Sequence, residues 1–342
     1  MNIILLSGGS GKRLWPLSNN IRSKQFVKIF KKKDGTFESM LQRVYRQIKE
    51  ADIDAHITIA TSKEQVPFIY NQLGEEVCIS VEPCRRDTFP AIALSTAYLV
   101  DMKHIDPNKP VIVCPIDPYT DEYYFKALKE LADQVEKDEA NLVLLGIEPT
   151  NPSEKFGYII PDGYSHIAKV NSFKEKPTVE VATKYINKGA LWNAGVFAFK
   201  PSYLLKKAHE LIDFTDYNDL LKKYETINKI SFDYAVVEHE TKIQVIRFSG
   251  TWKDIGTWNA LTEALMEPIV GKGIMNDTCS DVHIINELDI PILAVGLHNV
   301  VVSASEDGIL ICDKEQSEGL KPLITTLEQQ DALSDASCSN SK

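Results

Sequence analysis

A loop rich in glycine and cations follows the first apolar run of the chain. The residues from Ser7 to Leu17 read SGGSGKRLWPL, and Lys24 comes shortly afterwards. Glycine permits positive φ and leaves the backbone N–H groups open to the oxygens of a phosphate. Arg13 and Lys24 can bring two positive charges to the same phosphates. Packing alone gives no reason for this combination, so the loop is predicted to bind a phosphorylated ligand.

Two common phosphate-binding loops do not fit this spacing. A dinucleotide-binding G-x-G-x-x-G would need a third glycine where the chain has Leu14. A P-loop would need glycine at Leu6 and serine or threonine at Arg13. Pro16 also disfavours a helix that starts directly after the glycines. A dinucleotide-dependent oxidoreductase is therefore the disfavoured alternative.

The elements that must position this loop alternate between short apolar runs and helical patterns. Continuous apolar runs of this length are typical of strands buried on both faces of a sheet. The predicted strands are 2–6, 56–61, 77–81, 111–115 and 142–146, and the predicted helices between them include 36–49, 90–104 and 122–137. The alternation predicts an α/β fold with a doubly wound, mostly parallel sheet. Asp117 then follows the carboxyl end of a strand, where ligands bind in such sheets.

The pattern changes near the end of the chain. The segments VHIIN, ILAVG, NVVVS and GILIC, between residues 282 and 313, are short strands without room for helices between them. They predict a small C-terminal all-β appendage resembling a β-helix. We expect a catalytic domain over residues 1–268, the β-rich domain over 269–330 and a disordered tail over 331–342.

Composition narrows the class of protein further. The chain has 342 residues, 44% hydrophobic and 25% charged, which is typical of a globular protein. Its net charge of -10 argues against nucleic acid as a partner. The six cysteines lack metal-ligand spacing and are expected to be reduced thiols. No signal peptide and no apolar run of roughly 18 residues is evident, so a cytoplasmic location without membrane partners is expected.

The loop motif resembles that of a known enzyme family. SGGSGKRLWPLS, followed by SKQF at residues 23–26, is similar to the signature of the sugar nucleotidylyltransferases. The Trp15-Pro16-Leu17 and Lys24-Gln25-Phe26 blocks most resemble the mannose-1-phosphate guanylyltransferases. The resemblance implies a Rossmann-like nucleotidylyltransferase fold over about residues 1–313. It also implies nucleotide contacts from the loop, at Leu6, Gly8, Gly9, Gly11, Lys12, Arg13 and Lys24.

Two aspartates resemble the family's metal ligands. Asp117 follows the strand VIVCPI, and Asp254 lies in WKDIGTW, which is similar to the family's W-x-D-x-G-[ST]-W segment. The resemblance implies that this pair holds the catalytic Mg²⁺. Such an ion is usually held by one or two carboxylates together with substrate phosphates. The chain has Pro118 where the family commonly has histidine, a change that keeps the carboxylate but alters the neighbouring nucleotide contacts.

Three further segments resemble the family's sugar-phosphate site. FKEKP at 173–177 is similar to F-x-E-K-P, WNAGVF at 192–197 to W-N-[SA]-G-[IMV]-F, and FGYI at 156–159 to the G-Y-I segment. By resemblance, Glu175 and Asn193 contact the sugar hydroxyls, and Lys176 pairs with the sugar phosphate. Gly157 lets the hexose approach the backbone.

EPCRRDTFPAIAL, from Glu82 to Leu94, resembles a guanylyltransferase segment that borders the base and triphosphate. The residues implied there are Glu82, Arg86 and Thr88; Phe89 stands where small residues are usual.

The resemblance predicts a reaction between GTP and mannose 1-phosphate that gives GDP-mannose and pyrophosphate. Arg13, Lys24, Asp117 and Lys176 are the predicted catalytic residues. Two alternatives stay open at this stage. One is the same reaction with another hexose 1-phosphate or nucleotide, and the other is a sugar-nucleotide-binding homologue with weak activity. A homodimer is a further expectation from the resemblance.

Overall fold

The computed structural model describes residues 1–9, 12–19, 21–51 and 53–339, with only the backbone for residue 12 and residues 331–339. The chain forms two compact units. Unit 1 comprises residues 1–8, 44–116 and 120–252, and unit 2 comprises 9–43, 117–119 and 253–342. The sequence predicts a contiguous domain that ends at residue 268, whereas these units are discontinuous along the chain.

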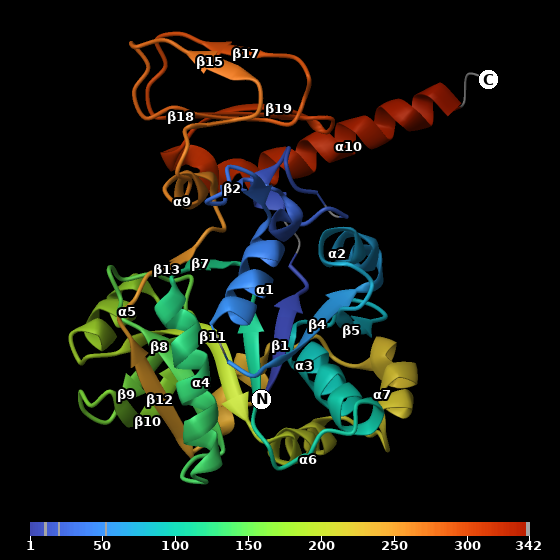
Figure 1. Ribbon diagram of the computed structural model, residues 1–342, viewed down its shortest axis with the longest axis vertical. Coiled ribbons are helices and arrows are strands. Elements are labelled where there is room, and N and C mark those ends of the chain that lie inside the picture. Colours follow the sequence, from blue (N-terminus) through green and yellow to red (C-terminus); the bar gives the residue numbers. More distant parts are fainter. Residues whose placement is uncertain (10–11, 20, 52, 340–342) are drawn as a thin grey trace. The chain divides into compact units, whose positions relative to one another are not determined.

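A nine-stranded sheet forms the centre of unit 1 (Figure 1). In spatial order its strands are β5 (Cys78–Glu82), β4 (His56–Ser62), β1 (Asn2–Ser7), β6 (Val111–Pro115), β11 (Leu191–Phe199), β8 (Leu142–Ile147), β12 (Ile243–Phe248), β10 (Ile167–Lys174) and β9 (Tyr158–Pro161). The five predicted strands correspond to β1, β4, β5, β6 and β8. The α/β class is therefore confirmed.

The sheet is mixed: seven of its nine strands run in the same direction, as a mostly parallel sheet predicts, and two run opposite to them. β5, β4, β1 and β6 are parallel, as are β8 and β12. β11, however, runs antiparallel to both β6 and β8, and β10 runs antiparallel to β12 and β9. A continuous apolar run indicates that a strand is buried on both faces of a sheet, but it does not indicate the direction of the strand. The five predicted strands do share one direction; the reversed strands, β11 and β10, lie in segments for which the apolar pattern predicted no strand.

Helices cover both faces of this sheet. On β6, Val113 belongs to an apolar core that includes Ile92 of α3 (Thr88–Ala97), whereas the next residue, Cys114, lies 3.1 Å from the hydroxyl of Tyr124 on α4 (Glu122–Glu136). Successive strand residues point to opposite faces, so α3 and α4 lie on different sides. The same apolar core includes residues of α6 (Pro201–Leu211), α7 (Tyr217–Lys223) and α8 (Phe232–Ala235). Before residue 252 the chain also forms α1 (Met40–Glu50), α2 (Val66–Leu73) and α5 (Val179–Ile186).

Unit 2 contains a coil of short strands. β14 (Ile269–Val270), β16 (His283–Asn286) and β18 (Val300–Ser305) pair in parallel, and so do β15 (Gly273–Met275) and β17 (Ile292–Ala294). β19 (Gly308–Asp313) closes the larger sheet antiparallel to β18. Parallel pairing between strands of successive turns is the arrangement of a β-helix. The short strands predicted over 282–313 are thus present.

The C-terminal segment is not all-β, which corrects that prediction. Residues Leu320–Ser339 form helix α10, which begins inside the predicted β-rich domain of residues 269–330; another helix, α9 (Trp258–Thr262), lies before that domain. Leu320 and Ile324 are buried one helical turn apart, the spacing of an apolar stripe on a helix. The predicted tail over 331–342 therefore begins within α10, and residues 340–342 lie outside the described part of the chain.

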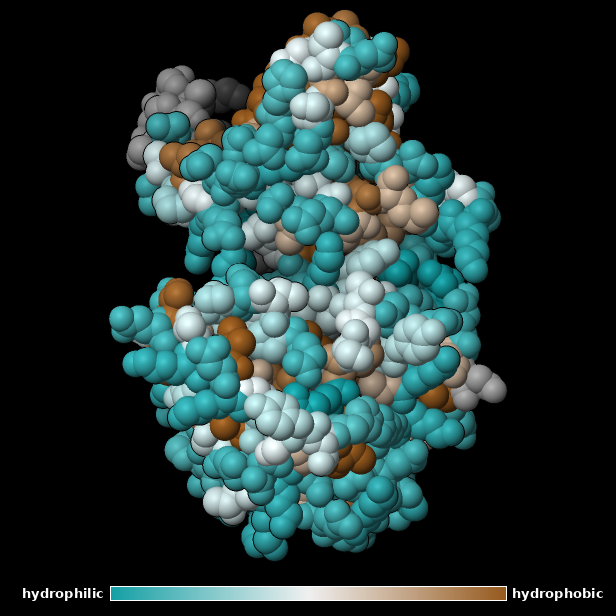
Figure 2. All heavy atoms as spheres, turned by 90° about the vertical axis from the view of Figure 1, so that its left-hand side faces the viewer, coloured by the Kyte–Doolittle hydropathy of each residue, from teal (hydrophilic) through white to brown (hydrophobic). Residues whose placement is uncertain are grey.

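Apolar side chains also reach the surface of unit 2 (Figure 2). Ile274 and Leu293 are in register on the paired strands β15 and β17 and are 68% and 73% exposed. These side chains therefore do not form a core between the two strands. Among the described helices, none has both the length and the apolar character needed to cross a membrane.

Candidate functional site

The candidate site residues of unit 2 lie around the ammonium group of Lys24. Its Nζ is 3.1 Å from Oδ2 of Asp117 and 3.8 Å from Oδ1 of Asp254. Lys24 begins the short 3-10 helix Lys24–Phe26, Asp117 immediately precedes β7 (Pro118–Thr120), and Asp254 ends β13 (Trp252–Asp254). β7 and β13 pair with each other. The structure thus brings together three predicted residues from distant parts of the sequence.

Arg13 contributes a second cation to this group. A Cβ built on Gly256 would lie 3.1 Å from Oδ1 of Asp254 and 3.3 Å from Nη1 of Arg13. The guanidinium and the carboxylate therefore both approach the bare backbone at Gly256. Desolvation favours the neutral form of Asp117, but Lys24 and, more weakly, Arg13 outweigh it and hold the pKa of this carboxyl below its ordinary value. Asp117 is consequently ionised at neutral pH.

Asp117 and Asp254 fit a divalent cation by the chemistry of their donors. Both carboxylates lie within ion-pair distance of one positive charge, so they can share a cation. Among the described residues there is no group of three or more histidine, cysteine, aspartate or glutamate side chains that could hold a metal. Two carboxylates are the usual protein contribution to a Mg²⁺ site that substrate phosphates complete.

The other described residues that are predicted to contact the nucleotide do not belong to the group formed by Lys24, Asp117, Asp254 and Arg13. A Cβ built on Gly8, which directly follows β1, would lie 3.6 Å from Oε1 of Glu82, while one built on Gly9 would have no neighbour within 4 Å. Leu6, on β1, packs against the apolar core of unit 1. Gly11 and the side chain of Lys12 lie outside the described part of the chain.

Glu82 is a buried carboxylate at the end of β5. The hydroxyl of Tyr224 donates a 2.9 Å hydrogen bond to its Oε2, and burial raises the pKa of Glu82 above its ordinary value. Arg86 donates to the carbonyl of Glu225, and the hydroxyl oxygen of Thr88 accepts a 2.8 Å bond from the N–H of Phe232. Arg86 and Thr88 therefore tie this segment to residues 225–232 of unit 1.

The predicted sugar-phosphate residues gather in unit 1. The N–H of Asn193 on β11 donates to the carbonyl of Gly157 at 2.8 Å, and a Cβ on Gly157 would lie 2.5 Å from Oε2 of Glu175. The ammonium of Lys176 is 3.0 Å from Oε1 of Glu175. All four predicted residues thus belong to one cluster, and Gly157 is the position where a side chain would collide with it.

Asp233 joins this cluster, and sequence reasoning missed it. Its Oδ1 accepts a 2.6 Å hydrogen bond from the side-chain amide of Asn193. Burial, and then the neighbouring charge of Glu175, raise the pKa of Asp233 to about 7. Its signal in the sequence is an acidic residue between Phe232 and Tyr234 in an apolar run, which spacing alone does not connect to Asn193.

An α/β sheet with a glycine loop after its first strand, and a carboxylate pair within reach of one cation, is the arrangement of an open-sheet protein that binds ligands at its strand ends. Residues 2–269 match the family described as nucleotidyl transferase. The chain belongs to this nucleotidyl transferase family and is an enzyme of that kind.

The chain is also similar to curated relatives and to a solved structure. The chain is 30% identical over 364 residues to the alginate biosynthesis protein AlgA of Pseudomonas putida, covering 96% of this chain and 71% of the relative. It is 28% identical over 365 residues to the mannose-1-phosphate guanylyltransferase of Escherichia coli, covering 95% and 74%. A solved structure described as mannose-1-phosphate geranyltransferase from Thermus thermophilus has a TM-score of 0.79 and 26% identity, covering 96% of this chain and 98% of that one.

Proposed function

We propose that the protein transfers a guanylyl group from GTP to mannose 1-phosphate in the presence of Mg²⁺, giving GDP-mannose and pyrophosphate. The observation that carries the proposal is the approach of Lys24 to both Asp117 and Asp254, since it gathers the charges needed to bind a triphosphate and its metal ion. The names of the relatives favour the mannose and guanine specificity.

The proposed step is a displacement at phosphorus. A phosphate oxygen of mannose 1-phosphate attacks the α-phosphorus of GTP, and the bond to the β-phosphate oxygen breaks. Pyrophosphate leaves with that electron pair. Reactions of this kind depend mainly on positioning and on charge neutralisation.

Residues of unit 2 would bind the triphosphate. Lys24 and Arg13 would stabilise the negative charge that develops on the departing pyrophosphate. Asp117 and Asp254 would hold Mg²⁺, which when bound neutralises phosphate oxygens and polarises the phosphorus. The lowered pKa of Asp117 keeps this carboxylate available to a cation at neutral pH.

Residues of unit 1 would bind the sugar phosphate. Lys176 would pair with its phosphate, and Glu175 would accept hydrogen bonds from hexose hydroxyls. Asn193 would be oriented by its bond to Asp233, leaving its remaining hydrogen-bonding capacity for the sugar. The absence of a Cβ at Gly157 leaves room beside Glu175.

Pyrophosphate release tests the proposal directly. The protein is assayed with Mg²⁺ against four nucleoside triphosphates and a panel of hexose 1-phosphates. We expect turnover with GTP and mannose 1-phosphate. Turnover with a different pair would keep the reaction class and move the specificity, while ligand binding without turnover with any pair would identify a binding homologue and refute the proposal.

A further inference from the structure

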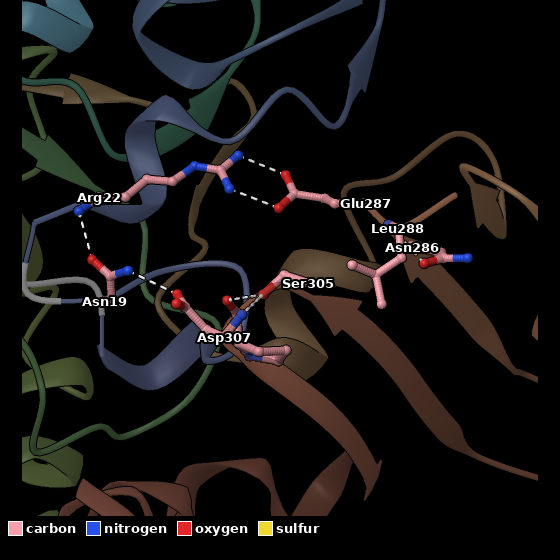
Figure 3. A network of polar contacts seen from close by, with 8 residues as sticks. Asn19, Arg22, Asn286, Glu287, Leu288, Ser305 and Asp307 are labelled. Atoms are coloured by element: carbon pink, nitrogen blue, oxygen red, sulfur yellow. Dashed lines mark hydrogen bonds and ion pairs between the residues drawn. The ribbon is translucent and has the colours of Figure 1, made fainter. Parts of the chain in front are cut away.

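The segment between the glycine loop and Lys24 is attached to the β-strand coil of unit 2. Figure 3 shows two of its side chains, Asn19 and Arg22, directed toward two turns of the coil. The turns are residues 286–290, after β16, and residues 305–308, between β18 and β19. These contacts join parts of the chain that lie up to 289 residues apart in the sequence.

Arg22 makes the first contact through both ends of its guanidinium. Nη1 and Nη2 donate to Oε2 and Oε1 of Glu287, each at 2.6 Å. Both side chains are about a third exposed, at 31% and 30%, so water screens the attraction between their charges. Two parallel hydrogen bonds nevertheless fix the direction of the guanidinium. The pair therefore fixes the orientation of Arg22 against the turn that carries Glu287.

Asn19 and Pro16 make the second set of contacts. The side-chain amide of Asn19 donates to Oδ2 of Asp307 at 2.7 Å, while its oxygen accepts from the N–H groups of Ile21 and Arg22. The hydroxyl of Ser305 donates to the carbonyl of Pro16 at 2.7 Å. Asn19 thus holds its own turn and links that turn to the coil.

The two turns that Arg22 and Asn19 contact are held by hydrogen bonds of their own. The side chain of Asn286 is buried, donates to the carbonyls of Lys272 and Ile290 at 2.8 and 2.7 Å, and accepts from the N–H of Leu288. The hydroxyl of Ser305 also accepts from the N–H of Asp307 at 3.1 Å. The carboxylates of Glu287 and Asp307 therefore extend from turns with defined backbones.

Three consecutive residues carry these contacts to the candidate site. Arg22 bonds to Glu287 of the coil, Ser23 donates from its buried hydroxyl to the carbonyl of Gly9 at 2.6 Å, and Lys24 pairs with Asp117. A displacement of Arg22 would therefore move both the glycine loop at Gly9 and the ammonium group at Lys24. No part of this chain of contacts depends on unit 1.

We propose that Arg22 and Asn19, held by Glu287 and Asp307, are positioning residues that set the glycine loop and Lys24 for reaction, so that the β-strand coil is part of the catalytic apparatus. This role rests on the nucleotidyl transfer proposed above. The coil acts through Arg22–Lys24 and touches no substrate itself.

The test compares Glu287→Gln and Asp307→Asn with Asp289→Asn as a matched control. Asp289 lies in the same turn as Glu287, but its carboxylate pairs with Lys272 of the coil at 2.8 Å instead of with Arg22. Hydrogen exchange of peptides covering residues 14–26 is measured without substrate. The values of kcat and KM are measured with the nucleotide and sugar phosphate that the wild-type protein turns over. Thermal unfolding shows whether the variants remain folded.

We expect faster exchange over 14–26 in Glu287→Gln and Asp307→Asn, with unchanged exchange in the control. We expect kcat to fall roughly ten- to hundredfold. KM for the sugar phosphate should stay within about twofold, because the residues predicted to bind the sugar phosphate belong to unit 1 and are not part of this chain of contacts. An Arg22→Gln, Glu287→Gln double variant should lose no more activity than the worse single variant, as for residues acting as one pair.

Unchanged hydrogen exchange over residues 14–26 in both Glu287→Gln and Asp307→Asn overturns the inference. Faster exchange with an unaltered kcat also overturns it, and so does an equal loss of kcat in the control Asp289→Asn. If the wild-type protein turns over no substrate pair, the proposed function fails instead, and exchange of residues 14–26 alone then decides whether the coil holds the loop.

Discussion

The side-chain amide of Asn193 donates a 2.6 Å hydrogen bond to the carboxylate of Asp233, beside Glu175 and Lys176. A partly buried acid next to another carboxylate favours its neutral form, which explains why the pKa of Asp233 rises to about 7. The candidate sugar site therefore contains a carboxylate that changes charge near neutral pH.

Asp233→Asn should make the protein more stable at pH 8 by roughly 2 kcal/mol. The folded protein holds the Asp233 proton up to about pH 7, whereas the unfolded chain releases it near the ordinary value of 3.8. Between about pH 4 and pH 7 the folded state therefore binds more protons than the unfolded state, so the wild type loses stability as the pH rises through this range. The gain from Asp233→Asn should be full above pH 7 and vanish near pH 4.

Thermal unfolding of both proteins between pH 5 and 8 measures this difference. Asp162→Asn, in the turn between β9 and β10, is the control for removing one carboxylate from unit 1 at another place. A constant difference between wild type and Asp233→Asn across the range would contradict the assignment. Turnover should also fall in Asp233→Asn if the charge of Asp233 helps to orient the sugar.

Gly157→Ala should weaken binding of the sugar phosphate. The added Cβ would lie 2.5 Å from Oε2 of Glu175 and 2.7 Å from the ring of Phe173, closer than such atoms can approach. Moving Glu175 aside should raise KM for mannose 1-phosphate by about tenfold and change KM for GTP little. Gly319→Ala, where a Cβ meets nothing within 4 Å, is the matched control. An unchanged KM would show that Glu175 does not contact the sugar.

The strands were predictable because burial on both faces leaves continuous apolar runs such as those of β1 and β6. The direction of β11 was not predictable, since its apolar sequence would read the same in either orientation. Helix α10 was missed because its buried stripe is short, with Leu320 and Ile324 buried while Leu323 and Leu327 are exposed. A homodimer stays a prediction.

In the candidate site, sequence motifs identified Lys24, Asp117 and Asp254, which the structure brings together. Asp233 and Arg22 could not be found in the same way. Each acquires its role from a contact made only in the folded chain; the pair of Arg22 and Glu287, for example, spans 265 residues of sequence. No local spacing records such a contact.

Lys24→Met should lower kcat by about 10²–10³-fold, the usual cost of removing one group that stabilises developing charge. Methionine keeps much of the length of the side chain but removes the ammonium that lies near Asp117 and Asp254. Lys28→Met removes an exposed ammonium from the same segment and should leave kcat unchanged. Equal losses in the two variants would mean that general electrostatics, and not the position of Lys24, causes the effect.

Asp117→Asn and Asp254→Asn should each reduce turnover by at least about 100-fold and raise the metal concentration needed for half-maximal rate. An amide is a neutral ligand, so it weakens attraction for a divalent cation while preserving the shape of the side chain. Binding of Mn²⁺ in the presence of GTP, followed by electron paramagnetic resonance, measures the metal site separately from turnover. The exposed Asp277, also in unit 2, provides the control variant Asp277→Asn. If either site variant bound Mn²⁺ as tightly as the wild type, that carboxylate would not be a metal ligand, because two carboxylates sharing one cation must both affect its affinity.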